Sequence, residues 1–279
     1  MVTHGYRRSH PLPQLEINTM SEPVLISAQQ GVAEIRFNRP DALNAIDVPT
    51  ALAFRDAVAA AAASSARVIV LAGTGRAFVA GGDLAYFRAA GEKAPEAARE
   101  LIVPMNDAIK ALAAASQPVV ASLHGPVAGA GMSVALAADL AIAADDVVFN
   151  MAYVKVGTSL DCSGSWTLPR IVGLRKALEI ALLSDSIDAN EALRLGMVNR
   201  VVPVALLEDA TRQLSQRLAA AAPLALGSIK RLLHDGWNRS LHAQLDAELE
   251  SFARNAGSAD FHEALEAFFT KRKPQFTGR

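Results

Sequence analysis

Three glycine-rich turns are where this sequence is best suited to chemistry that uses backbone groups. They comprise residues 77–84, 124–133 and 157–166. Small residues let backbone N–H groups approach a ligand without a Cβ in the way, and a helix that begins at such a turn adds the positive end of its dipole. Two converging N–H groups are able to hold an oxyanion. The turns therefore indicate an oxyanion-binding site.

Several other kinds of site are excluded by spacing and residue type. The Gly-x-Gly at residues 129–131 lacks the third small residue of a dinucleotide-binding turn, and residues 73–76 lack the Gly-Lys-Ser/Thr of a P-loop. No His-x-x-x-His pair or acidic cluster predicts a metal site, so none is expected. The single cysteine, Cys162, excludes a disulfide scaffold. We interpret Cys162, Ser133 and His124 as packing or hydrogen-bonding residues.

Composition narrows the class of protein and its partners. The chain has 279 residues, a formal net charge of −1 and 51% hydrophobic residues. A near-zero charge predicts no general attraction to nucleic acid or to an anionic membrane, and no apolar stretch is long enough to span a bilayer. Residues 1–21 are polar without an apolar core, which predicts a flexible arm and not a secretory signal. A cytoplasmic location is the expectation.

The elements that must position the turns alternate between strand and helix. We expect a mobile loop at 85–97 followed by helix to residue 115, and then a helical pattern with only short breaks from residue 206 to the end. The pattern predicts an α/β core with right-handed crossovers over residues 22–203 and a helical region over residues 204–279. Strands are expected at 24–28, 32–37, 68–72, 118–123, 140–144, 147–149 and 197–201, and helices at 48–63, 129–138, 164–172 and 174–183.

Five motifs occur in the order and spacing of one known family. They are Asn38-Arg39-Pro40 with Leu43-Asn44-Ala45, Ala77-Phe78-x-Ala80-Gly81-x-Asp83-Leu84, Gly129-Ala130-Gly131 with Ala138-Asp139-Leu140, Leu168-Pro169-Arg170, and Ala192 with Gly196-Met197-Val198. Together they resemble the enoyl-CoA hydratase/isomerase (crotonase) superfamily over roughly residues 22–279. The resemblance implies a spiral of ββα units, a C-terminal helical region that mediates trimerisation, and an acyl-CoA thioester as the ligand.

The resemblance also implies which backbone groups form the oxyanion hole. They are the N–H groups of Ala80 and Ala130. A thioester carbonyl becomes an enolate when a neighbouring C–H is deprotonated, and fixed donors aimed at that oxygen stabilise the charge as it develops. Removing one such donor typically costs about 3 kcal/mol of transition-state stabilisation.

The acid/base residues depart from the hydratase pattern. Hydratases of this family carry two glutamates, and the matching positions hold Ser133 and Tyr153. The acid nearest the third turn is Asp161, in a setting that resembles the aspartate-using epoxyphenylacetyl-CoA isomerase-like and Δ-isomerase members, where the aspartate is the proton shuttle. Asp161 also aligns with the nucleophilic aspartate of 4-chlorobenzoyl-CoA dehalogenase. Asn106 stands where that enzyme has a histidine, which argues against dehalogenation.

The sequence allows two roles for Asp161. With an ordinary pKa of about 3.9 it would be a weak base for a C–H bond, but burial among Val127, Val156 and Leu160 would raise that pKa. A raised pKa suits a carboxylate that takes and returns a proton. The alternative is a helix N-cap for the 163–166 region, and it stays open.

The resemblance suggests further residues along the acyl-CoA. No covalent cofactor is expected, because coenzyme A arrives as part of the substrate. We expect the C-terminal tail to meet the nucleotide part of CoA in its own or a neighbouring subunit of a homotrimer or dimer of trimers. The expected substrate and CoA contacts are Ala42, Leu43, Ala45, Phe78, Gly82, Asp83, Leu84, Gly129, Tyr153, Phe268 and Lys271.

The favoured function is therefore C=C isomerisation of an enoyl-CoA, with Asp161 as the proton shuttle. A second hypothesis is hydration or hydrolysis of an unusual acyl-CoA, with Asp161 orienting a water molecule. A non-catalytic acyl-CoA binder is a third, because both glutamate positions are non-acidic.

Overall fold

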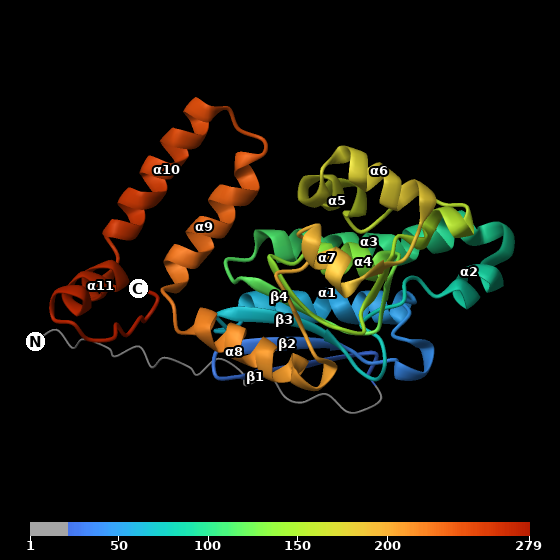
Figure 1. The fold of residues 1–279 in the computed structure, drawn as a ribbon, viewed down its shortest axis with the longest axis horizontal. Helices are drawn as coiled ribbons and strands as arrows, with labels where there is room; N and C mark the ends of the chain where they lie inside the picture. Colours follow the sequence, from blue (N-terminus) through green and yellow to red (C-terminus); the bar gives the residue numbers. More distant parts are fainter. Residues whose placement is uncertain (1–21) are drawn as a thin grey trace, which may run out of the picture.

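The computed structural model describes residues 22–279 and contains two sheets beside a set of helices (Figure 1). The arm expected at residues 1–21 lies outside the described residues. The larger sheet has the order β1-β2-β3-β4-β6-β9, and the smaller has the order β5-β7-β8. The strands are β1 (Val24–Gln29), β2 (Val32–Phe37), β3 (Val68–Gly73), β4 (Val119–Leu123), β5 (Pro126–Ala128), β6 (Leu140–Ala144), β7 (Val148–Asn150), β8 (Ile187–Asp188) and β9 (Arg200–Val202).

The larger sheet begins with a hairpin of the two strands expected at 24–28 and 32–37, and it continues in parallel. β1 and β2 pair antiparallel through a two-residue turn, Gln30 and Gly31, whose φ values of 51° and 79° are both positive. Such a turn matches the right-handed twist of the two strands. From β2 to β9 every neighbouring pair is parallel. The carboxyl ends of these strands therefore lie on one edge of the sheet, and the glycine-rich turns follow β3 and β4 there.

Alternate residues of β3 face two different helical layers. Ile69 and Leu71 belong to the main core, which includes buried residues of α1 and α3, while Val68 and Val70 pack with residues of α8 on the other face.

The helices are α1 (Val48–Ala63), α2 (Leu84–Ala90), α3 (Ala94–Ala114), α4 (Ala130–Leu136), α5 (Gly164–Val172), α6 (Leu174–Leu183), α7 (Ala189–Arg194), α8 (Leu207–Ala219), α9 (Pro223–Gly236), α10 (Leu241–Ala256) and α11 (Ala259–Phe269). The predicted α/β core with a helical end is confirmed.

The loop expected at residues 85–97 is wrong, because this stretch is mostly helix. Asp83 caps α2 by accepting hydrogen bonds from Ala85 N and Tyr86 N, and α3 begins at Ala94 with Pro95 in its first turn. Pro104 lies inside α3, so it neither starts nor ends that helix. The apolar stripe of α3 extends towards its N-terminus through Ala97 and Leu101, which are buried, and packing of that stripe explains the longer helix.

The C-terminal helices divide into one that belongs to the core and three that project from it. α8 lies on the sheet through Leu214 and Leu218, so the core extends beyond the expected boundary at residue 203. α9 and α10 form an antiparallel pair that leads away from the sheets to α11 at the far end of the molecule (Figure 1). Within residues 22–279, none of the helices is both long and apolar enough to cross a membrane.

Candidate active site

The first two glycine-rich turns run side by side in parallel. Val79 and Val127 form an isolated parallel bridge, and Ala128 N donates to Val79 O at 3.0 Å. The backbones stay close beyond the bridge, because a Cβ on Gly129 would lie 3.7 Å from the Cα of Gly81. That distance would admit a Cβ, but the φ of 50° at Gly129 is a conformation that residues with a Cβ rarely adopt. The pairing brings Gly82 and Ala130, which follow Gly81 and Gly129, to the same side of the two turns.

A cavity of about 460 Å³ opens beside these paired turns. Its polar side is made by the backbone of the two turns and by the side chains of Tyr153, Thr158, Ser159 and Asp161. Its apolar side comes mainly from α2, α3 and the segment before α5, through Leu84, Phe87, Ala94, Ala98, Ile102, Val156 and Leu160. Asp161 is the one carboxylate that lines it within the part of the chain that the structure describes.

The N–H group of Ala80 does not serve as an oxyanion donor in this structure. It donates to Leu43 O at 3.1 Å, so it already has an acceptor in the neighbouring segment. This corrects the sequence prediction for Ala80, although the residue does line the cavity. The reason is tertiary: residues 43–46 lie against the turn and accept hydrogen bonds from the N–H groups of Ala80 and Asp83. Spacing within the turn cannot reveal this contact.

The N–H groups of Gly82 and Ala130, one in each of the paired turns, have no acceptor among the described residues. Ile46 takes the groups on either side of Gly82, because Ile46 N donates to Gly81 O at 2.8 Å and Asp83 N donates to Ile46 O at 2.8 Å. A parallel bridge of this kind turns the N–H of Gly82 away from Ile46. Ala130 is the first residue of α4, where a backbone N–H has no acceptor within its own helix. Gly82 and Ala130 both line the cavity.

These two positions share the register of the bridge. Val127 is 48 residues after Val79, and Ala130 is likewise 48 residues after Gly82. The geometry therefore combines the predicted donor of Ala130 with Gly82 in place of Ala80. The sequence predicted Gly82 only as a substrate contact. What identifies Gly82 is its bridge to Ile46, which uses the groups on either side and leaves the Gly82 N–H facing away, and this requires knowing which segment lies beside the turn.

Asp161 is held by a hydroxyl and does not cap a helix. Its Oδ1 accepts a short hydrogen bond from the hydroxyl of Tyr153, and Ser163, with no side-chain cap, stands at the N-cap position of α5. Burial raises the pKa of Asp161 above its usual range, while the Tyr153 hydrogen bond acts in the opposite direction. The N-cap alternative is therefore excluded by the structure. A buried carboxylate with a raised pKa is suited to taking up and returning a proton.

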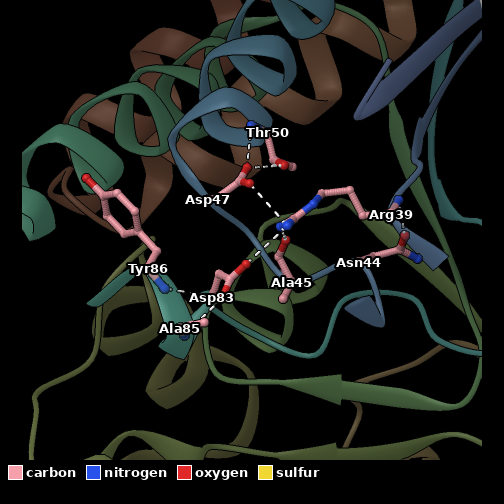
Figure 2. Close-up of polar contacts among 8 residues, drawn as sticks. All are labelled: Arg39, Asn44, Ala45, Asp47, Thr50, Asp83, Ala85 and Tyr86. Carbon is pink, nitrogen blue, oxygen red and sulfur yellow. Dashed lines mark hydrogen bonds and ion pairs between the residues drawn. The ribbon is translucent and has the colours of Figure 1, made fainter. Parts of the chain in front are cut away.

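Asp83 serves the architecture of the turn. Its Oδ1 caps α2, and its Oδ2 lies 3.1 Å from the guanidinium of Arg39, which also contacts Asp47 Oδ2 at 3.2 Å (Figure 2). Arg39 donates to Ala45 O as well, so it ties the segment after β2 to the turn that carries Gly82. Asp83 is not among the residues that line the cavity. Arg39 belongs to the first of the five sequence motifs, but the motif alone does not indicate this role.

Of the remaining predicted contacts, some line the cavity and others do not. Leu84, Gly129 and Tyr153 line it, whereas Ala42, Leu43 and Ala45 lie behind the turn, with the Leu43 and Ala45 carbonyls hydrogen-bonded as above. Phe78 is fully buried, with its ring 5.9 Å from that of Phe37, so it is a core residue and the predicted ligand contact is wrong.

Phe268 and Lys271, at the end of α11, are far from the cavity of their own chain. α11 lies at one end of the molecule, and α2, which lines the cavity, lies at the opposite end (Figure 1). The side chain of Phe268 is 77% exposed. The part of the prediction that allowed these residues to meet CoA in their own subunit is therefore wrong.

Comparisons with known proteins agree on one family. The family described as Enoyl-CoA hydratase/isomerase matches residues 27–279. A probable enoyl-CoA hydratase of Rhodobacter capsulatus is 38% identical over 90% of this chain and 96% of its own length. The 1,2-epoxyphenylacetyl-CoA isomerase of Escherichia coli K12 is 35% identical over 93% of this chain and its full length. The crystal structure of a Streptomyces coelicolor protein described as a putative enoyl-CoA hydratase superposes with a TM-score of 0.89, at 31% identity over 98% of each chain.

Proposed function

Since the chain belongs to the enoyl-CoA hydratase/isomerase family, we propose that it is an isomerase that moves a C=C bond along an enoyl-CoA. One observation carries the proposal. Asp161 is the single carboxylate on the cavity wall among residues 22–279, and it lies beside the two turns whose unused N–H groups converge there. One carboxylate that both takes and returns a proton is sufficient for isomerisation.

The reaction proceeds through a dienolate. Asp161 removes a proton from a carbon next to the C=C bond, and the electron pair of that C–H bond spreads over the conjugated system to the thioester oxygen. The N–H groups of Gly82 and Ala130 hold this oxygen as it gains charge. The protonated Asp161 then returns the proton to the other end of the dienolate. The product that leaves has the same composition as the substrate and a displaced double bond.

The lining of the cavity favours an acyl chain without charge. Its apolar wall is built from leucine, isoleucine, valine, phenylalanine and alanine side chains, and no lysine or arginine of the described chain lines it. An aliphatic or aromatic enoyl group suits this wall, because burial of its carbons is favourable. A chain ending in a carboxylate would meet Asp161 without a compensating cation.

Coenzyme A enters as part of the substrate, and we propose that a neighbouring subunit helps to hold it. In a homotrimer or dimer of trimers, Phe268 and Lys271 would meet the nucleotide part of CoA bound to another copy. Support comes from the exposed apolar side chains of α9–α11, among them Leu233 at 69%, Phe252 at 69% and Phe269 at 76%. Such a surface is typical of an interface between subunits.

Hydration is the second candidate, because the Rhodobacter capsulatus relative is described as a probable hydratase. Ser133 and Tyr153 are hydroxyls already bonded to each other at 3.1 Å, so two carboxylates that would share a catalytic water are not present at these positions. We expect crotonyl-CoA hydration to be at least about 10²-fold slower than in an enzyme with two catalytic carboxylates, from the usual size of a general acid/base contribution.

The test is incubation of the purified protein with a panel of enoyl-CoA esters in D₂O, followed by mass spectrometry. Isomerisation gives an isomer that is separated by chromatography before the mass is measured, with deuterium at carbon where the proton on Asp161 exchanges with solvent before it is returned. Hydration adds the mass of water, and hydrolysis releases free CoA. Asp161→Asn is expected to abolish isomerisation and deuterium uptake while ester affinity stays within about tenfold. Full activity of this variant, or binding without any exchange in the parent protein, contradicts the proposal.

A further inference from the structure

Asp161 stands at the end of a chain of three hydroxyl and carboxyl groups drawn from separate elements. Ser133 comes from α4, Tyr153 from the short 3-10 helix Ala152–Val156, and Asp161 from the segment before α5. Ser133 Oγ lies 3.1 Å from the Tyr153 hydroxyl, which in turn donates to Asp161 Oδ1. Ser133 is fully buried and Tyr153 is 7% exposed. The contacts therefore belong to the packed interior and not to a mobile surface.

The direction of each hydrogen bond follows from the number of protons available. A tyrosine hydroxyl has one proton, and in this structure it points to Asp161. The proton between Ser133 and Tyr153 must therefore come from Ser133. Burial and the neighbouring carboxylate both raise the pKa of Tyr153, so its hydroxyl stays protonated and remains a donor over the working pH range.

The two oxygens of Asp161 are thereby made unequal. Oδ1 receives the hydrogen bond from Tyr153, and among the described residues no N–H or O–H donates to Oδ2. The thiol of Cys162 is the other side-chain donor towards this carboxylate. The pKa of that thiol is itself raised by burial, so it stays neutral. Tyr153 and Cys162 are thus the titratable groups that face Asp161.

Resting on the isomerase function proposed above, we propose that Tyr153 is a positioning residue that holds Oδ1 of Asp161, so that Oδ2 is the oxygen that carries the proton to and from the substrate. A carboxylate fixed at one oxygen keeps the other in a defined place, and such positioning contributes to the rate. A hydrogen bond to the charged form also favours the ionised carboxylate, which is the form that acts as the base.

Ser133 connects the hydrogen-bonded pair of Tyr153 and Asp161 to Ala130, one of the two proposed oxyanion donors. It lies three residues after Ala130 on α4, a helix of 7 residues, so the base and one oxyanion donor share one rigid element through Tyr153. The space for this connection depends on Gly164, because a Cβ there would lie 2.5 Å from Ser133 Oγ. The distance between proton carrier and oxyanion donor is therefore set by packing of the interior.

The experiment compares pH profiles of kcat/KM for deuterium exchange into an enoyl-CoA that the parent protein isomerises. Tyr153→Phe keeps the ring and removes the donor. We expect the acid limb to move to higher pH by about one unit, because a hydrogen bond to the charged form is lost. On the plateau we expect kcat about tenfold lower with KM within about threefold. Ser133→Ala, which removes only the second link, is expected to shift the limb in the same direction by less.

Two further variants separate a positioning role from the alternatives. In an Asp161→Asn background, where only ester affinity can be measured, Tyr153→Phe is expected to leave that affinity within about threefold, because Tyr153 acts through Asp161 and not on the substrate. Replacing Tyr153 with 3-fluorotyrosine, a stronger donor with the same ring, is expected to move the acid limb to lower pH. This variant also keeps the test decisive if the phenylalanine variant does not fold.

Superposable pH profiles for the parent and Tyr153→Phe would overturn the inference, as would a tenfold loss of ester affinity on adding Tyr153→Phe to Asp161→Asn. The second result would mean that Tyr153 acts on the substrate itself. If Asp161→Asn is fully active, the proposed function fails. If Asp161→Asn is inactive and the Tyr153 profiles do not move, only the role of Tyr153 fails.

Discussion

Val79 and Val127 pair across two turns that are 48 residues apart, and this single parallel bridge sets Gly82 against Ala130. The pairing decides which backbone groups reach the cavity. Along the extended segment at 80–83, the N–H groups of Ala80 and Asp83 are used by Leu43 and Ile46, and the N–H of Gly82 has no acceptor among the described residues.

Replacement of single peptide bonds by ester bonds tests this assignment. An ester before residue 82, made with glycolic acid in place of Gly82, removes only the N–H and is expected to lower kcat by 10²-fold or more, since an oxyanion donor is worth about 3 kcal/mol. The matched control is an ester at Ala80, made with lactic acid. It removes the bond to Leu43 O and is expected to reduce stability by about 1 kcal/mol with kcat within about threefold. The reverse pattern would restore Ala80 as the donor.

Ala130 offers a simpler test of the second donor. As the first residue of α4 it occupies a position where proline is accepted in helices, so Ala130→Pro removes the N–H with little strain in the helix. We expect a loss of about 10²-fold in kcat for Ala130→Pro and less than about tenfold for Ala130→Gly. Circular dichroism of both variants checks the fold. Equal activity of the two folded variants would show that this N–H does not act.

Ser163→Gly is expected to stabilise the protein. Ser163 has a φ of 70°, and its buried Oγ has no hydrogen-bond partner in the described structure. Glycine adopts this conformation without the penalty that a Cβ brings, and the buried hydroxyl is removed as well. We expect the free energy of unfolding to rise by about 1 kcal/mol, measured by urea denaturation. A decrease would mean that the Ser163 side chain has a partner or a packing role.

Arg39→Lys is expected to destabilise the turn that carries Gly82. Arg39 contacts two carboxylates and a carbonyl at once, and a lysine has neither the planar fork nor the number of donors to replace it (Figure 2). We expect a loss of about 2 kcal/mol in the free energy of unfolding. Arg55→Lys is the control, since that exposed pair with Asp56 is expected to contribute less than about 0.5 kcal/mol. Equal effects of the two substitutions would contradict the role given to Arg39.

Deletion of residues 259–279 is expected to break assembly and CoA binding together. It removes α11 with its exposed apolar side chains, and also the chain end that is bonded to Arg67 through Phe276 O. Sedimentation measures assembly, and CoA titration measures binding. The paired substitution of Phe268 and Phe269 by alanine leaves the chain end in place and serves as the milder variant. A truncated protein that assembles and binds CoA as before would remove α11 from the site.

Residue spacing was sufficient to predict most elements of the core. The bounds of α1, α5 and α6 agree with the expected ranges, because their starts and ends depend on local signals such as the Asp47 cap and the glycines around α5. The segment at 85–97 was missed, since its helices are stabilised by burial of one face and not by strong local signals.

The sequence by itself determined the family and the positions of the three turns, and it predicted Ala130 and Asp161 as candidate site residues. These depend on residue type and order along the chain. Only the tertiary structure decided that Gly82 and not Ala80 has the unused N–H, that Phe78 belongs to the core, and that α11 lies far from its own cavity. It also decided that Tyr153 donates to Asp161. Each of these depends on which segment lies against which, and packing between distant parts of the chain sets that arrangement, not spacing along the sequence.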